Sequence, residues 1–178
     1  MKKNKKTPEI VLGPLKNSDS NVLWSWINNR DQVLFNAPYK PVHESQHQAW
    51  FESILKRDDV VIFGIRLIKT NELIGACQLH HIDPLSRSAE LQVRLGAVGE
   101  RNKGYGTEAV RQLLRFGFND LNLHRVYLHV FSANAPAIRV YEKLGLSREG
   151  LLRQAVHLDG RYEDVILMGI LRDEFKDG

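Results

Sequence analysis

The chain has 178 residues, enough for one domain with a substantial core and too few to predict two. Hydrophobic residues make up 43% of it and charged residues 26%, close to globular averages, which excludes an intrinsically disordered chain. The formal net charge is +4, but Lys2, Lys3, Lys5 and Lys6 carry as much positive charge by themselves. We therefore expect a flexible Lys-rich tail over residues 1–9, and a single domain over residues 10–178 that does not bind nucleic acid.

Cysteine content and hydropathy restrict the compartment. The single cysteine, Cys77, excludes an intramolecular disulfide framework and is expected to be a small apolar strand residue, not a nucleophile. The sequence contains no run of about 20 apolar residues, the length needed to span a membrane. A secretory signal would continue with an apolar segment after the lysines, but Thr7-Pro8-Glu9 follows them instead. These features predict a cytoplasmic protein without a membrane partner.

The first half of the chain predicts helices between a short strand and a hairpin. Residues 10–12 form an apolar strand, and Val22, Leu23, Trp26 and Ile27 then recur at helical spacing. The later predictions are a loop over 36–41, a helix over 47–55, and a hairpin over 60–82.

The second half alternates strands and helices. We expect a strand over 89–95, a loop over 101–106, an amphipathic helix, a strand over 126–131, a helix over 134–144 ended by Gly145, and strands over 152–158 and 165–171. This order predicts a mixed α/β fold built on one sheet.

The segment Arg101-Asn102-Lys103-Gly104-Tyr105-Gly106 is the most informative part of the sequence. It lies between a predicted strand and a predicted helix, where glycines let backbone N–H groups approach a ligand and the helix N-terminus adds partial positive charge. Two cationic side chains in the loop suit phosphate. The loop therefore predicts a phosphorylated cofactor.

Two familiar phosphate loops fit poorly. Gly104, Gly106 and Ala109 match a permissive dinucleotide fingerprint, but no Asp or Glu lies between Asp120 and Glu142 to hold a ribose. The nucleoside-triphosphate loop fails because Tyr105-Gly106 stands where Lys-Ser/Thr is required.

A wider pattern gives a better match. Arg101-x-x-Gly104-x-Gly106, a helix, a strand and then residues 134–146 (NAPAIRVYEKLGL) resemble the GCN5-related N-acetyltransferase (GNAT) family. The resemblance implies a single mixed, mostly antiparallel sheet with helices on both faces. It also implies acetyl-CoA as cosubstrate and no metal, with the pyrophosphate bound by backbone N–H groups of residues 101–107 and the pantetheine between splayed strands at 89–95 and 126–131.

The resemblance also assigns individual roles. Tyr141 matches the general acid that protonates the departing thiolate, and Asn134 matches a residue that hydrogen-bonds pantetheine, although it also suits a helix N-cap. A main-chain N–H on the strand ending at Leu95 is expected to stabilise the oxyanion. Further cofactor contacts are expected from position. The Thr107 hydroxyl on the first helical turn suits a phosphate oxygen, the alternative being an ordinary first-turn polar residue. Lys143 suits the CoA 3′-phosphate, the alternative being a solvated lysine, and Ala137 is a further cofactor contact.

The catalytic base and the acetyl acceptor are predicted from weaker patterns. Glu90 shares a strand face with Gln92 and Arg94, and we expect this face to line the acceptor site, with Glu90 as base directly or through a water. The near-neutral body and the Arg- and Trp-containing N-terminal segment favour a nucleotide-linked amino sugar as acceptor. The alternatives are a protein N-terminus, a polyamine, or a CoA-binding sensor without turnover. A homodimer is possible.

His43 and His47 form the bare zincin pattern in His43-Glu44-Ser45-Gln46-His47. No third ligand is evident, and the apolar stripe that follows indicates an ordinary surface helix. We therefore expect neither a zinc protease nor a metal.

Overall fold

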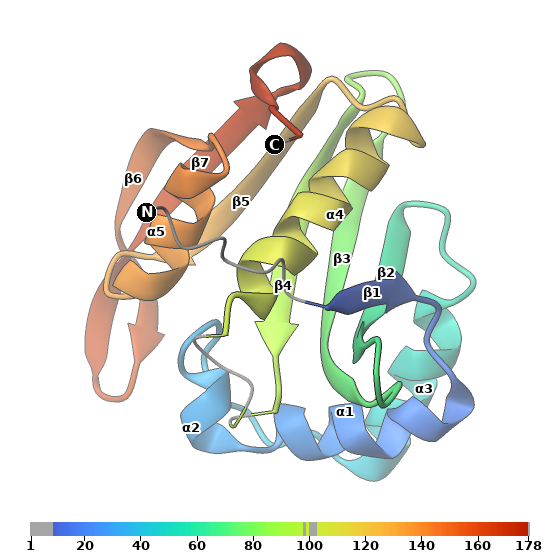
Figure 1. The fold of residues 1–178 in the computed structure, drawn as a ribbon. Coiled ribbons are helices and arrows are strands. Elements are labelled where there is room, and N and C mark those ends of the chain that lie inside the picture. Colours follow the sequence, from blue (N-terminus) through green and yellow to red (C-terminus); the bar gives the residue numbers. More distant parts are fainter. Residues whose placement is uncertain (1–8, 98, 100–102, 178) are drawn as a thin grey trace, which may run out of the picture.

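The computed structural model describes residues 9–97, 99 and 103–177. Its strands form a seven-stranded sheet in the order β1-β2-β3-β4-β5-β7-β6 (Figure 1). The strands are β1 (Ile10–Gly13), β2 (Val60–Leu67), β3 (Leu73–Asp83), β4 (Ser88–Leu95), β5 (Arg125–Phe131), β6 (Ser147–Leu158) and β7 (Arg161–Leu171). The α-helices are α1 (Ser20–Ile27), α2 (Arg30–Val33), α3 (Glu44–Ile54), α4 (Tyr105–Asn119) and α5 (Ala135–Lys143).

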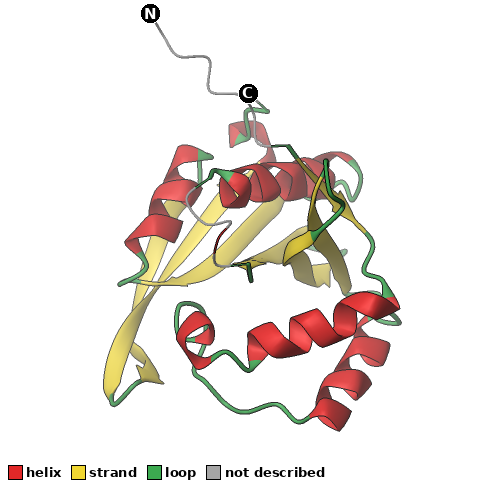
Figure 2. Ribbon diagram, turned by 60° about the horizontal axis from the view of Figure 1, so that its bottom comes forward, coloured by secondary structure: helices red, strands yellow, loops and turns green. Residues whose placement is uncertain are grey.

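Only β4 and β5 pair in parallel, and the other neighbours in the sheet are antiparallel. The helices cover both faces, with α4 and α5 on one side and α1 to α3 on the other (Figure 2). The predicted fold class, a single mixed and mostly antiparallel sheet with helices on both faces, is confirmed.

The main core lies between the sheet and α4. One face of α4 is fully buried because its apolar residues recur at helical spacing, and it packs on alternate residues of the central strands. The members of α4 in this core are Ala109, Val110, Leu113, Leu114 and Phe118. This packing fixes the N-terminus of α4 beside the end of β4.

A smaller cluster on the opposite face joins α1 and α3 to β3 through Leu23, Phe51 and Leu73. A buried ion pair supports it, because Arg66 Nη2 of β2 lies 2.5 Å from Asp19 Oδ2 at the start of α1. Asp19 also accepts a hydrogen bond from the Lys16 backbone at 2.7 Å. The start of α1 is thus fastened to the sheet.

Two elements differ from the prediction. The four-residue helix α2 was not expected, and β6 begins at Ser147 instead of near residue 152. Nearly all of β6 is exposed, so its early residues lack the alternation that identifies a half-buried strand. Gly145 adopts φ 94°, which confirms its predicted role in ending α5.

Candidate functional site

The sheet opens between β4 and β5. Their parallel pairing covers only Ser88–Arg125, Ala89–Val126 and Glu90–Tyr127. Beyond these pairs both strands continue, each held by its outer neighbour alone, so the facing edges of residues 91–95 and 128–131 have no ladder partner. Unpaired main-chain groups between strands bind an extended, amide-containing ligand in the manner of an added strand.

The end of β4 presents a donor to this gap. Gly96 N donates to the Ile74 carbonyl of β3 at 3.0 Å. Because successive N–H groups of a strand point to opposite edges, the N–H of Leu95 points away from β3 and toward the gap. This position suits the oxyanion donor that was predicted at Leu95.

The N-terminus of α4 lies next to the gap. Gly104 is its N-cap with φ 88°, a left-handed conformation that glycine adopts without strain. Within the helix, Glu108 N donates to the Gly104 carbonyl at 3.1 Å, so the N–H groups of Tyr105, Gly106 and Thr107 precede the first helical hydrogen bond. No side chain caps them, and the arrangement suits an anion.

Asn134 is the N-cap of α5. Its Oδ1 accepts a hydrogen bond from Ala137 N at 3.2 Å, and its Nδ2 donates to the Phe35 carbonyl at 3.1 Å. The capping role, one of two alternatives left open by the sequence, is confirmed. Ala137 is half-buried against the core, and Asn134 Oδ1 is the partner of its backbone N–H.

Tyr141 lies in the core below the exposed face of α5, with 8% of its surface exposed. Burial raises the pKa of its hydroxyl to about 12. The hydroxyl makes no hydrogen bond to any residue that the structure describes. It therefore remains protonated near neutral pH and has its proton available for a ligand.

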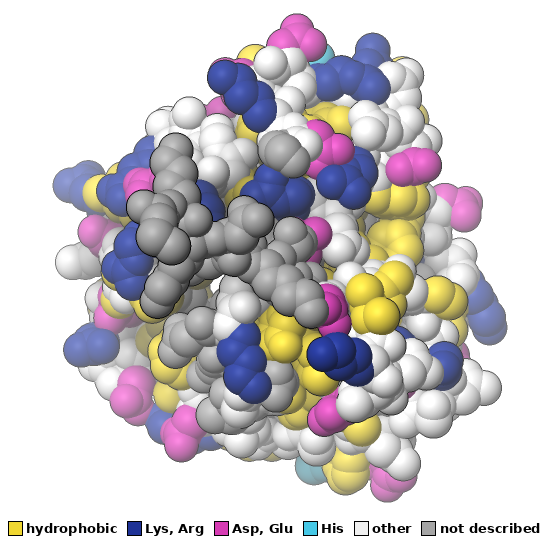
Figure 3. Space-filling view, in the orientation of Figure 1, with side chains coloured by type: hydrophobic (Ala, Val, Ile, Leu, Met, Phe, Trp, Pro, Cys, Tyr) yellow, Lys and Arg dark blue, Asp and Glu magenta, His cyan; other side chains and the backbone are white. Residues whose placement is uncertain are grey.

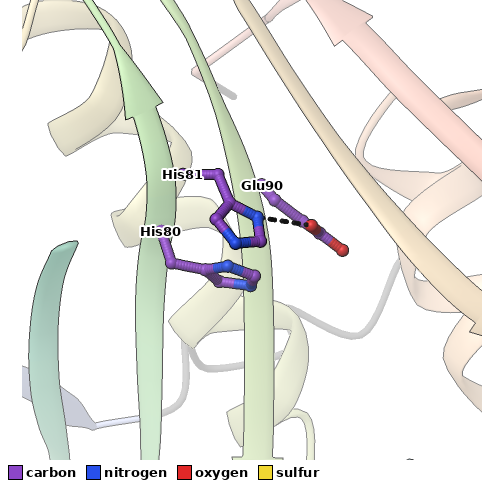
Figure 4. A group of neighbouring side chains, drawn as sticks. All are labelled: His80, His81 and Glu90. Carbon is purple, nitrogen blue, oxygen red and sulfur yellow. Dashed lines mark hydrogen bonds and ion pairs between the residues drawn. The ribbon is translucent and has the colours of Figure 1, made fainter. Parts of the chain in front are cut away.

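Glu90 is surrounded by histidines on the face of the sheet opposite α4 (Figure 4). His129 Nδ1 lies 2.7 Å from Glu90 Oε1, and His81 Nδ1 lies 3.2 Å from Oε2. Burial raises the pKa of Glu90, but the hydrogen bond from His129 and the charges of His80 and His129 outweigh it, so the pKa lies below its usual value. Glu90 is an ionised carboxylate at neutral pH.

A polar row extends from Glu90 along β4. Gln78 Nε2 donates to Gln92 Oε1 at 2.7 Å, which leaves Gln78 Oε1 buried without a partner. Arg94 follows on the same face, half-buried, and forms neither a hydrogen bond nor an ion pair with any described residue. Burial lowers the pKa of Arg94. Unsatisfied polar groups of this kind indicate a polar ligand.

Trp26 of α1 covers the far end of this face. A Cβ added at Gly96 would lie 1.9 Å from Trp26 Cδ2, so only glycine allows the indole to pack against the end of β4. The aromatic ring thus closes one side of the region where the strands separate.

The predicted site residues fall into separate groups. Arg101 and Asn102 lie outside the described residues, while Lys103 and Lys143 are exposed at the ends of the neighbouring helices. No hydrogen bond or ion pair among the described residues links Glu90 to Tyr141, which belong to opposite faces of the sheet. The gap between β4 and β5 passes between the two faces, so it lies between Glu90 on one face and Tyr141 on the other.

The zincin pattern does not assemble a site. His43 is the exposed N-cap of α3, whereas His47 is buried with Nε2 2.8 Å from the Ser20 carbonyl oxygen. Burial lowers the pKa of His47. Cys77 is a buried core residue whose pKa burial raises to about 12, which confirms its predicted structural role.

Two hollows open on the surface. One of about 320 Å³ lies between α1 and residues 41–44, and another of about 230 Å³ lies beside Phe116. Neither is lined by a predicted catalytic or cofactor-binding residue. On the face in Figure 3, Lys and Arg side chains are interspersed with acidic ones.

Sequence reasoning missed His80, His81 and His129 as neighbours of Glu90. The adjacent histidines could have been matched to Glu90 by counting the register back from the turn after β3, where His80 pairs with Glu90. The same count places His81 on the opposite face. The sequence could therefore predict that His80 lies beside Glu90, but not that His81 does.

Comparisons with known proteins agree on one family. Residues 9–147 match the family described as acetyltransferase (GNAT) domain. A spermidine N(1)-acetyltransferase of Vibrio cholerae is 30% identical over 169 residues, covering 94% of this chain and 95% of the relative. An uncharacterized N-acetyltransferase, p20, of Bacillus licheniformis is 36% identical over 172 residues, covering 95% and 96%.

A solved structure extends this likeness to three dimensions. The crystal structure of the spermidine N-acetyltransferase from Vibrio cholerae in complex with CoA and spermine superposes with a TM-score of 0.86 at 29% identity. The alignment covers 93% of this chain and 97% of that chain. Within the part of the chain that the structure describes, no helix is long and apolar enough to cross a membrane.

Proposed function

The chain belongs to the acetyltransferase (GNAT) family and transfers the acetyl group of acetyl-CoA to an amine, and we propose that this amine belongs to a polyamine of the spermidine type. The observation that carries the proposal is the match over nearly the whole chain to the spermidine acetyltransferase of Vibrio cholerae, in sequence and in a structure with CoA and spermine. This acceptor replaces the nucleotide-linked amino sugar that the sequence favoured, because the comparisons support the polyamine alternative better.

The charge at Glu90 supports a cationic acceptor. A polyamine carries several ammonium groups, and the reference pKa of such an amine is about 10.4. An ionised, half-buried carboxylate attracts them, and the interaction is stronger there than in bulk water. We assign Glu90 to the acceptor amine, whose proton it takes directly or through a water.

The cosubstrate is assigned to the gap and to the N-terminus of α4. The unpaired edge of residues 91–95 suits the pantetheine amides, and the N–H groups of residues 105–107 suit the pyrophosphate. Asn134 and Ala137 border the same region from α5, while Lys103 and Lys143 are assigned to the phosphates as exposed cations.

Acetyl transfer then proceeds in two bond changes. The acceptor ammonium first loses one proton to solvent. The neutral amine nitrogen then attacks the acetyl carbonyl carbon, and the N–H of Leu95 stabilises the oxyanion that forms. As the C–S bond breaks, the sulfur leaves with the bonding electron pair and receives the proton of the Tyr141 hydroxyl. The amine proton passes to Glu90, and the products are an acetamide and CoA.

Arg94 favours a second class of acceptor. Its guanidinium is half-buried without an anionic partner among the described residues, on the strand face that holds Glu90. A guanidinium in this state suits a carboxylate or phosphate of the ligand, as in a nucleotide-linked amino sugar. A linear polyamine offers no such group.

An acceptor panel distinguishes the two classes. Release of the CoA thiol is measured with spermidine, spermine, a nucleotide-linked amino sugar and a ribosomal-protein N-terminal peptide. We expect the highest kcat/KM for the polyamines, with at least a tenfold loss in Glu90→Gln and a smaller change in Arg94→Gln. A preference for the amino sugar that Arg94→Gln abolishes would replace the polyamine assignment.

A further inference from the structure

His80, His81 and Glu90 form a cluster with the composition of a metal site. Each offers one ligand atom, and these atoms all lie within 4.8 Å of one another. The two imidazoles leave neighbouring residues of β3 and lie beside each other in front of β4, from which Glu90 projects (Figure 4). Their ring centroids are 4.5 Å apart.

A β-bulge brings the second histidine into this cluster. Successive side chains of a regular strand point to opposite faces, so His80 and His81 should be separated by the sheet. Here the register between β3 and β4 shifts between His80 and Asp83, and His81 adopts φ 50°. Bulges turn a side chain toward a new direction and are frequent beside functional sites.

The geometry points to a binding site for a divalent transition-metal ion of the zinc class, with His80, His81 and Glu90 as its three protein ligands. Two histidines and one glutamate form a known three-ligand zinc set that leaves a fourth position for water or a ligand. Two atoms bound tetrahedrally at about 2.1 Å from zinc lie about 3.4 Å apart. His81 Nδ1 and Glu90 Oε2 are already separated by 3.2 Å.

The surroundings of the cluster suit an ion that arrives from solvent. The His81 side chain is 62% exposed, whereas that of Glu90 is only 17% exposed. His129 contacts the other carboxylate oxygen, Oε1, and so orients Glu90 while Oε2 faces the histidines. Such a hydrogen bond to a ligating carboxylate is the usual support of a metal ligand.

A bound ion would regulate acetyl transfer, a consequence that rests on the proposed role of Glu90. An ion held by Glu90 prevents that carboxylate from accepting the amine proton and repels a cationic acceptor. The N-terminus of α4 takes no part in the cluster, so acetyl-CoA binding is unaffected. Zinc is therefore expected to inhibit competitively against the polyamine and not against acetyl-CoA. The sequence alone predicted no metal.

Binding is tested first, without activity, on the untagged full chain. Titration calorimetry with ZnCl₂ in a non-chelating buffer should give one site, while MgCl₂ gives none because magnesium prefers oxygen ligands. His80→Gln and His81→Asn should each weaken zinc binding at least tenfold, and asparagine tolerates the positive φ at position 81. Circular dichroism checks that both variants fold.

Two matched controls identify the site. His124→Ala removes an exposed histidine outside the cluster, and His43→Ala removes the exposed histidine of the zincin pattern. Zinc affinity that is unchanged in both controls supports the cluster. Absence of binding up to millimolar zinc, or loss of binding in His43→Ala alone, overturns the site. Binding at the cluster without competition against the acceptor supports the site and overturns the assignment of Glu90 to the acceptor.

Discussion

Replacing Tyr141 with phenylalanine isolates the chemistry of one hydroxyl from the packing of its ring. The hydroxyl has no hydrogen bond to a described residue, so its removal breaks no hydrogen bond within the part of the chain that the structure describes. We therefore expect the free energy of unfolding to change by less than about 1 kcal/mol. Loss of a general acid lowers kcat by about 10²–10⁴, while the Kd for acetyl-CoA remains within about twofold.

The raised pKa adds a second signature. With a pKa of about 12, only about one hydroxyl in ten thousand is ionised at pH 8, so ionisation of Tyr141 contributes no basic limb to the rate profile between pH 7 and 10. Steady-state release of the CoA thiol at saturating substrates measures both effects. Tyr162→Phe, at a tyrosine that is 65% exposed, is the matched control and should retain full activity. Wild-type turnover in Tyr141→Phe would refute the assignment of the general acid.

Three further substitutions test the framework of the site. Gly104→Val should weaken acetyl-CoA binding at least tenfold in calorimetry, because φ 88° strains any other residue. Gly99→Val is the control and should leave binding unchanged, because nothing lies within 4 Å of the new Cβ. Gly96→Ala should raise the acceptor KM and destabilise the fold by about 1–3 kcal/mol, because the methyl group displaces Trp26; an unchanged melting temperature would contradict this packing. Asp19→Asn should cost about 3–5 kcal/mol in urea unfolding by leaving Arg66 buried without its charge partner, and a loss below about 1 kcal/mol would show that the pair is dispensable.

The sequence predicted those parts of the fold that depend on local patterns. The apolar stripe of α4, the alternation in the central strands and the glycine at position 145 all correspond to observed elements. The short helix α2 and the first residues of β6 escaped prediction because neither carries a periodic apolar signal. The GNAT family and the acetyltransferase activity were also predicted correctly, since their motifs lie within residues 101–146.

The surroundings of the candidate catalytic residues depend on tertiary geometry. The contact of Glu90 with His129 joins residues 39 apart, and the approach of His81 depends on a bulge that reverses the expected alternation. The comparisons support the polyamine alternative better than the amino sugar that the sequence ranked first, because charge composition says nothing of which charges face the site. The roles assigned to Tyr141, Glu90 and the cofactor-binding residues stay predictions, as do the homodimer, the cytoplasmic location and the flexible tail of residues 1–9.

The most direct test is mass spectrometry of spermidine after incubation with the protein and acetyl-CoA. We predict a product heavier by one acetyl group, formed in a one-to-one ratio with free CoA and absent when Tyr141→Phe replaces the wild type over the same interval. Spermidine that remains unmodified, while calorimetry shows that acetyl-CoA binds, would contradict the account.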